Sequence, residues 1–577
     1  MSRIGVFVCH CGLNIAGTVD VQAVVEAARR HPDVGFAIDY KYMCSDPGQQ
    51  LIKDSIAEHN LDGVVVAACS PAMHETTFRR TVGGAGLNPY RCESANIREQ
   101  VSWVHEKEKE AATLKAAAIA RSIVEKVKGN EELEPLTLPL NHRALVIGGG
   151  IAGMQAALDV ASAGFPVILV ERDDHLGGNM ARLSGSYINF KADPHLLQKV
   201  IERVMNHPYI QVLTSAQVME VSGYVGNFKA RVKVDETSPE SGLEASEFTF
   251  DLGAIIAATG WQPYDMGQLH EYGSGIIQDV VDGLSFEKML ASGDAIRRPS
   301  DGKIAREIVF VQCAGSRDRE HGVAYCSKVC CMTVAKQAML YRDRVPGGQA
   351  YVFYIDIRSA GKGYDEYVQR AMTDHQVLYL RGKVSKIFRE SDQPGAKVIV
   401  WGVDTLSDRT VEIAADLVVL ATPMYPAQGS TELGQLLHIS TDAYGFFNEA
   451  HPKLRPVETL TAGIFLAGVG QGPKDIPETV AQASGAAAKV LQLFSKDEMT
   501  ASPMVATVIE ELCAACGACV EVCPYGAREI HPVWNIARVN AALCQNCGAC
   551  VVACPNKASQ VHNWRPAQIL AMIDEVL

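Results

Sequence analysis

The sequence predicts a multidomain α/β protein with a small N-terminal α/β domain, a large central α/β region and a compact cysteine-rich C-terminal domain. Three observations lead to this prediction. The chain has 577 residues, too many for a single hydrophobic core. Short apolar runs, such as residues 63–68 and 144–147, alternate with helical segments. Polar stretches at 129–135 and 496–503 have the composition of linkers, which gives domains at 1–135, 140–500 and 503–577.

Composition and charge argue against several classes of protein. A net charge of −13 leaves little to neutralise a phosphate backbone, so we expect no nucleic-acid partner. No apolar stretch reaches the roughly 20 residues that cross a bilayer, so we expect no transmembrane segment. Residues 1–8 lack the pattern of a signal peptide, and we therefore expect a cytoplasmic protein. In that reducing compartment, 17 cysteines in tight groups favour metal ligation or redox chemistry over disulfides.

The C-terminal domain contains one cysteine motif twice. The motif is Cys-x2-Cys-x2-Cys-x3-Cys-Pro, and its copies begin at Cys513 and Cys544. In two-cluster iron–sulfur domains, the fourth cysteine of each copy ligates the other [4Fe–4S] cluster. The predicted ligand sets are Cys513, Cys516, Cys519 and Cys554 for one cluster, and Cys544, Cys547, Cys550 and Cys523 for the other. The alternative is a zinc ribbon, but zinc requires neither the third cysteine nor the Cys-Pro pair.

The central region opens with a dinucleotide-binding fingerprint. An apolar strand at 144–147 leads into Gly-x-Gly-x-x-Gly and an alanine-rich helix. The glycines allow a tight turn, close approach of a pyrophosphate and close helix–strand packing, and the helix N-terminus favours the anion. A second strand at 167–170 ends at Glu171, where a carboxylate can accept hydrogen bonds from ribose hydroxyls. The residues of the loop are Gly148, Gly150, Ile151, Ala152 and Gly153.

Later segments favour FAD over NAD. Residues 171–179, 254–260 and 461–468 resemble FAD-binding segments of two-dinucleotide-domain flavoproteins of the thioredoxin reductase type. The resemblance implies FAD-binding segments at 140–265 and 416–495, with a degenerate second nucleotide domain at 266–415. Most of that superfamily has an aspartate after the last glycine of the motif; this chain has Val469, so Asp475 becomes the candidate partner of the ribityl chain. The other candidate residues are Arg172, Gly178, Asn179, Thr259, Gly260 and Gly468.

The second nucleotide domain lacks a phosphate-binding loop. Its strand at 307–312 is followed by Cys313 and not by Gly-x-Gly-x-x-Gly, so NAD(P)H is not expected as the direct reductant. Cys326, Cys330 and Cys331 come next, leading into an expected helix. Four cysteines at a strand end and a helix start favour a third [4Fe–4S] cluster. The alternative is a redox disulfide that leaves two of the cysteines without a role.

These motifs resemble those of the A-type subunit, the flavin subunit, of heterodisulfide reductases. The resemblance spans nearly the whole chain and includes the spacing of the Cys313–Cys331 group and the segments 9–17, 42–48 and 468–477. In that family a lysine at the position of Lys336 lies beside the flavin, where its charge would stabilise a reduced, anionic isoalloxazine. The alternative is a lysine on a helix surface.

The N-terminal domain holds five further cysteines. Each lies at or just beyond the end of an expected strand, and in a parallel sheet the carboxyl ends gather at one edge. We therefore predict a fourth [4Fe–4S] cluster at this edge; buried free cysteines are the alternative. The predicted ligands are Cys9, Cys11, Cys44 and Cys69, and the fifth cysteine is Cys92.

The resemblance implies an electron-transfer subunit of a larger complex. FAD accepts an electron pair and releases single electrons, so it suits a site among one-electron clusters. Family members take electrons from an electron-input subunit and pass them to disulfide-reducing subunits of B and C type and to ferredoxin, by flavin-based bifurcation; we also expect a homodimer. This chain lacks the ferredoxin module that many members insert after residues 223–228, and a cysteine pair around 187–193. Its chain of clusters is expected to be shorter.

Two other functions stay open. A homologous subunit serves quinone-interacting complexes and aromatic-ring-reducing complexes of the benzoyl-CoA reductase type. From a different class, the chain would be a redox-sensing scaffold without turnover. The cysteine-rich domains that cleave the disulfide in a sister subunit are absent from this sequence, so the polypeptide alone is not expected to reduce a heterodisulfide.

Overall fold

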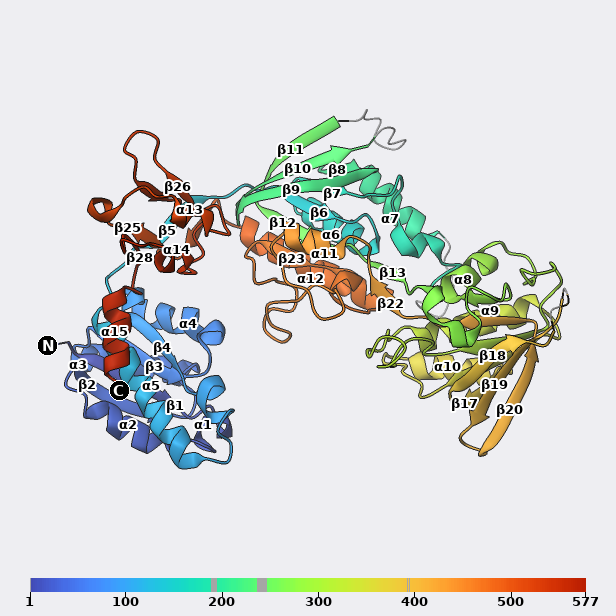
Figure 1. The fold of residues 1–577 in the computed structure, drawn as a ribbon, viewed down its shortest axis with the longest axis horizontal. Helices are drawn as coiled ribbons and strands as arrows, with labels where there is room; N and C mark the ends of the chain where they lie inside the picture. Colours follow the sequence, from blue (N-terminus) through green and yellow to red (C-terminus); the bar gives the residue numbers. More distant parts are fainter. Residues whose placement is uncertain (1, 188–194, 236–245, 392, 394) are drawn as a thin grey trace. The chain divides into compact units, whose positions relative to one another are not determined.

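A computed structural model describes residues 2–187, 195–235, 246–391, 393 and 395–577. The chain forms two compact units, one of residues up to 138 together with 498–577, the other of residues 139–497 (Figure 1). Two expectations fall at least partly outside the described residues: the missing cysteine pair around 187–193, and the cysteine-free stretch at 236–239 that stands where other family members carry a module. In the described part of the chain, no helix is both long and apolar enough to span a membrane.

The N-terminal domain is a three-layer α/β/α structure. Its parallel sheet has the order β2 (Val34–Tyr40), β1 (Ile4–Cys9), β3 (Gly63–Ala68) and β4 (Cys92–Asn96). Both β1 and β3 are buried throughout, which explains their uninterrupted apolar sequences. One face packs against α2 (Val21–Arg29) and α5 (Lys109–Lys128), the other against α3 (Asp46–His59) and α4 (Pro71–Gly83).

The C-terminal cysteine-rich domain shows its duplication in the backbone. It has two antiparallel pairs, β25 (Ala506–Val508) with β28 (Ser559–Val561) and β26 (Arg528–Ile530) with β27 (Ala537–Val539). Two matching short helices lie within the cysteine motifs and carry the third cysteine of each, α13 (Ala518–Glu521) and α14 (Ala549–Val552). The last helix, α15 (Pro566–Asp574), leaves this domain and lies along α5 of the N-terminal domain (Figure 1). The sequence alone did not indicate that the two ends of the chain join in one unit.

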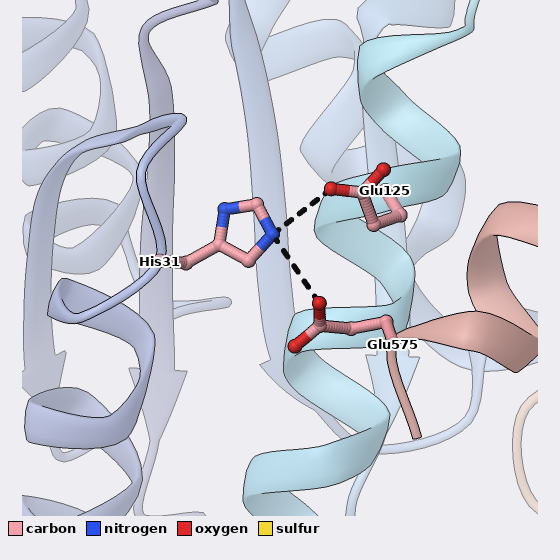
Figure 2. Close-up of side chains that lie close together, drawn as sticks. All are labelled: His31, Glu125 and Glu575. Carbon is pink, nitrogen blue, oxygen red and sulfur yellow. Dashed lines mark ion pairs between the residues drawn. The ribbon is translucent and has the colours of Figure 1, made fainter. Parts of the chain in front are cut away.

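Ion pairs fasten the C-terminal helix to the N-terminal domain. The Nε2 atom of the buried His31 lies 3.0 Å from a carboxylate oxygen of Glu125 on α5 and 3.8 Å from one of Glu575, just after α15 (Figure 2). Lys128 also pairs with Glu125, and Arg121 with Glu575. Each of the two carboxylates therefore pairs with a second basic side chain besides His31, and the five side chains form one ion-pair network.

The central unit contains two nucleotide-binding-type sheets. The first has the order β23 (Ile464–Leu466), β12 (Ala254–Ala257), β6 (Ala144–Ile147), β7 (Val167–Val170) and β8 (Ile210–Leu213). It is covered by α6 (Ile151–Ser162), on which α12 (Ile476–Phe494) packs, and by the antiparallel strands β9 (Ala216–Tyr224), β10 (Asn227–Val234) and β11 (Ser246–Leu252). The second sheet has the order β14 (Val280–Asp282), β21 (Leu417–Leu420), β15 (Glu307–Val311), β16 (Gln349–Tyr354) and β17 (Leu378–Arg381). A three-stranded sheet of β18 (Val384–Arg389), β19 (Val398–Asp404) and β20 (Arg409–Ala415) packs against it.

One expected boundary differs from the structure. The sequence assigned residues from 416 onward to the returning FAD-binding segment, but β21 lies between β14 and β15 in the second sheet. The chain returns one strand later, through β22 (Met424–Pro426), which pairs with β13 (Trp261–Pro263). A fully buried parallel strand of four apolar residues looks the same in either sheet, so its sequence did not determine which one it joins.

Candidate functional site

Two cavities in the C-terminal domain are each lined by four cysteines. One is lined by Cys513, Cys516, Cys519 and Cys554, and the other by Cys523, Cys544, Cys547 and Cys550. Each cavity thus combines three cysteines of one motif copy with the fourth of the other, the crosswise sets expected from the sequence. The thiol groups and the small residues beside them fit [4Fe–4S] clusters.

Backbone N–H groups point at several of these sulfur atoms. Ala537 donates to Cys513 Sγ at 3.3 Å, Ala506 to Cys544 Sγ at 3.3 Å and Ala558 to Cys554 Sγ at 3.2 Å. Burial opposes ionisation of Cys554, but the backbone N–H groups outweigh it and lower the pKa of the thiol. These donors favour the thiolate form that ligates iron.

The glycine loop has room for a pyrophosphate where the fingerprint requires it. Gly148 has a φ of +112°, and a Cβ there would lie 2.4 Å from Ala258 O. A Cβ at Gly153 would lie 1.8 Å from Gly148 O, so helix and strand are in close contact. At Gly150 no atom of the described residues lies within 4 Å of the position that a Cβ would take, and this residue is the N-cap of α6, with no side-chain cap among those residues. The open space and the first N–H groups of α6, at Ile151 and Ala152, suit an anion.

The acidic residue after β7 is held over this loop. Glu171 is buried, and its two carboxylate oxygens accept from the backbone N–H of Gly149 at 2.6 Å and of Asp173 at 2.9 Å. Thr259, after β12, has a buried hydroxyl with no hydrogen-bond partner among the described residues. A hydroxyl in that situation fits a bound polar ligand.

Of the remaining residues expected to bind FAD, most have contacts or backbone angles that suit a binding site, and Arg172 does not. Gly178 packs on Gly150, and Gly260 and Gly468 have positive φ values. Asn179 donates to Trp261 O at 2.6 Å. Arg172 instead is exposed and donates to Gln428 O at 2.8 Å, away from the loop contacts.

Asp475, the expected partner of the ribityl chain, has contacts within the protein. Asp475 is the N-cap of α12, where one carboxylate oxygen accepts from Glu478 N at 2.8 Å. The other oxygen accepts from the hydroxyl of Tyr364 at 3.0 Å. These contacts give Asp475 a role as the cap of the helix that begins at Ile476, and its contact with the ribityl chain stays a prediction.

The third cysteine group gathers at the end of β15 and the start of α9 (Cys330–Arg344). Cys313 follows the strand with a positive φ of 56°, and Cys330 and Cys331 are the first two residues of the helix. Burial raises the pKa of Cys330 well above the usual range, and the thiols of Cys331, Cys313 and Cys326 raise it further, so all four groups are near neighbours. The backbone N–H of Arg358 donates to Cys331 Sγ at 3.4 Å.

Lys336, on α9, is buried and not on a helix surface. Its Nζ donates to Gly185 O at 2.8 Å and pairs at 2.7 Å with Glu287 of α8 (Gly283–Ala291). Glu287 also accepts from Gln337 at 2.7 Å and from the backbone and hydroxyl of Ser184. Burial lowers the pKa of Lys336, and Glu287 opposes that shift. Glu287 was not among the residues expected from the sequence, although an acid on the buried face of an otherwise apolar helix indicates a buried cationic partner.

Four of the N-terminal cysteines meet at the carboxyl edge of the first sheet. Cys9 ends β1, Cys69 follows β3, and Cys44 and Cys11 lie in the adjoining loops. Cys9 Sγ accepts from the N–H groups of Cys11 at 3.3 Å and Met43 at 3.4 Å. Burial raises the pKa of Cys69 to about 11, and the nearby charge of Arg98 opposes it.

Cys92 does not belong to this group. It is the first residue of β4 and pairs with Val64 near the start of β3, so it lies at the amino edge of the parallel sheet. The sequence had put it after a short run ending near Tyr90, but that segment is a 3-10 turn, η1 (Pro89–Arg91), that precedes the strand.

Comparison with known proteins defines the class. Residues 142–302 match the family model "Pyridine nucleotide-disulphide oxidoreductase", and residues 506–555 match "4Fe-4S dicluster domain". The protein is therefore an oxidoreductase component with an FAD domain and a domain for two [4Fe–4S] clusters. Among solved structures, thioredoxin reductase of Lactococcus lactis is 18% identical and has a TM-score of 0.42, with 62% of this chain and 99% of that one covered.

Full-length relatives identify the family. The second A-type iron–sulfur subunit of the CoB–CoM heterodisulfide reductase of Methanopyrus kandleri is 41% identical, over 92% of this chain and 91% of the relative. The A-type subunit of the H(2):CoB-CoM heterodisulfide,ferredoxin reductase of Methanothermobacter thermautotrophicus is 40% identical, over 100% of this chain and 97% of the relative. The chain belongs to the family of A-type heterodisulfide reductase subunits, as its motifs had indicated.

Proposed function

We propose that this chain carries electrons between FAD and four [4Fe–4S] clusters inside a heterodisulfide-reductase-like complex. The observation that supports the proposal is that two cavities with four cysteines each, and eight further cysteines near strand ends, occur in the same chain as a dinucleotide loop with room for a pyrophosphate. Two groups line the cavities of the dicluster domain. The other two, Cys313–Cys331 and the N-terminal group, supply four thiols each.

The residues around the flavin site have distinct tasks. The N-terminus of α6 would hold the pyrophosphate and Glu171 the adenosine ribose, and the hydroxyl of Thr259 would gain the partner that it lacks among the described residues. Lys336, neutralised in part by Glu287, would present a positive charge to the isoalloxazine. When bound, FAD supplies the step between electron pairs and single electrons.

Partners follow from the relatives. We expect an electron-input subunit, disulfide-reducing subunits of B and C type, a second copy of this chain, and ferredoxin as an acceptor. The name of the Methanothermobacter relative includes both the heterodisulfide and ferredoxin, which supports bifurcation as the reaction of this protein. A homologous complex with quinone-linked or aromatic-ring-reducing partners is the second candidate. The stretch after residue 228 has no cysteines where many family members insert a ferredoxin module, so this chain lacks one route by which those members pass electrons on.

Cofactor content tests the proposal. Protein purified without oxygen should contain one FAD and about sixteen irons per chain, the content of four [4Fe–4S] clusters. Replacing Cys330 by Ser should remove about four irons while leaving the signals of the dicluster domain in EPR spectra. About eight irons in the wild-type protein would confine the clusters to the C-terminal domain and refute the four-cluster wiring. Flavin that is not reduced within the turnover time of the assembled complex would favour a sensing scaffold.

A further inference from the structure

A buried arginine lies at the N-terminal cysteine group. Arg98 is the first residue of a π-helical turn, η2 (Arg98–Ser102), that directly follows β4 at the carboxyl edge of the sheet. Asn96 fixes this turn, since its side-chain oxygen accepts from the N–H groups of Arg98 and Glu99. Single π turns occur frequently at functional sites.

The guanidinium of Arg98 is directed at sulfur. One terminal nitrogen donates to Cys11 Sγ at 3.3 Å, and the other donates to Met73 Sδ at 2.8 Å and to Glu99 at 2.7 Å. The ring of Trp103 covers the guanidinium at 4.9 Å. Arg98 is only 9% exposed, so its charge is poorly screened by water.

This arrangement fits an anionic centre. Burying a guanidinium is costly unless anions compensate it, and a neutral thiol is a weak acceptor. Glu99 compensates one side of Arg98, but the nitrogen that reaches Cys11 has no carboxylate partner among the described residues. A cluster held by thiolates would give this nitrogen an anionic acceptor.

We propose that Arg98 raises, and Glu99 lowers, the reduction potential of a cluster held by the N-terminal cysteines, so that the pair sets how readily this centre accepts an electron. The inference rests on the proposed fourth cluster. Reduction adds one electron and therefore one negative charge to the centre, which a nearby cation stabilises and a nearby carboxylate destabilises. Arg98 acts through charge and a hydrogen bond to Cys11 and is a positioning residue, not a ligand.

The test is an EPR-monitored redox titration of the full-length protein with its cofactors. Cys44→Ser first identifies the N-terminal signal by removing it. Arg98→Gln should shift the reduction equilibrium of that signal at least tenfold toward the oxidised form, about 59 mV for a one-electron couple. Glu99→Gln, which keeps an acceptor for the N–H of Ser70, should shift it in the opposite direction. Arg29→Gln, an exposed cation on α2, is the matched control and should leave it unchanged.

The outcomes separate the two proposals. If Cys44→Ser removes neither iron nor an EPR signal, the fourth cluster is absent and the inference is overturned with it. If the cluster is present but both charge variants leave its potential unchanged, or shift it in the same direction, only the role of Arg98 and Glu99 is overturned. Should Arg98→Gln fail to fold, the upward shift expected for Glu99→Gln decides the matter, and its absence would refute the inference.

Discussion

The buried pair of Glu287 and Lys336 offers the sharpest test of the central unit. Their side chains are 1% and 7% exposed, and Glu287→Gln would leave the lysine charge without its carboxylate. Breaking a buried pair from one side costs about 3–5 kcal/mol, because an uncompensated charge remains. For a unit of this size, we expect the temperature of thermal unfolding to fall by about 4–7 °C.

The sign of the pH dependence follows from the lysine. Burial already lowers the pKa of Lys336 below its ordinary value of 10.5, and loss of Glu287 would lower it further. Between the folded pKa and 10.5 the unfolded chain then binds more protons than the folded one. The free energy of unfolding of the variant should therefore rise with pH across this window, more steeply than that of the wild type.

The rise in flavin fluorescence as FAD is released on heating gives the unfolding temperature, and repeating it at several pH values gives the pH dependence of stability. Lys288→Gln, an exposed position on the same helix, is the control. The double variant Glu287→Gln with Lys336→Met should recover much of the loss, because neither charge is then left buried alone. A single variant that melts with the wild type, or a double variant no better than the single one, would refute this account of the pair.

Three other predictions address the remaining sites. Cys554→Ser should remove about four irons. Adding Cys513→Ser to this variant should remove no more, whereas adding Cys544→Ser should bring the loss to about eight irons. Equal losses in the two double variants would contradict the crosswise ligand sets. Gly150→Leu should fold normally by circular dichroism but lose most of its FAD, because its side chain would occupy the open space over the loop; full flavin content would place the pyrophosphate elsewhere. His31→Ala should weaken the docking of α15 by about 0.2–1 kcal/mol and speed hydrogen exchange in that helix; unchanged exchange would show that the ion pair of His31 with Glu575 contributes little.

Local chemistry in the sequence determined much of this protein. Residues 63–68, 144–147 and 167–170 form strands with the predicted bounds, because buried parallel strands need unbroken apolar runs. The glycine loop was equally readable, since its backbone geometry restricts which residues fit. The crosswise cysteine sets followed from spacing alone, because two copies of one motif leave few ways to surround two cubes.

Tertiary structure decided what depends on residues far apart in the chain. Apolarity buries a strand such as β21 but does not select its neighbours, so its sheet was assigned wrongly. Cys92 resembled the other N-terminal cysteines until the direction of β4 put it at the opposite edge. Glu287, Arg98 and the helix α15 acquire their roles from partners brought together by folding. A charge or an apolar face in a sequence states that a partner is needed, and only the packed chain determines which one it meets.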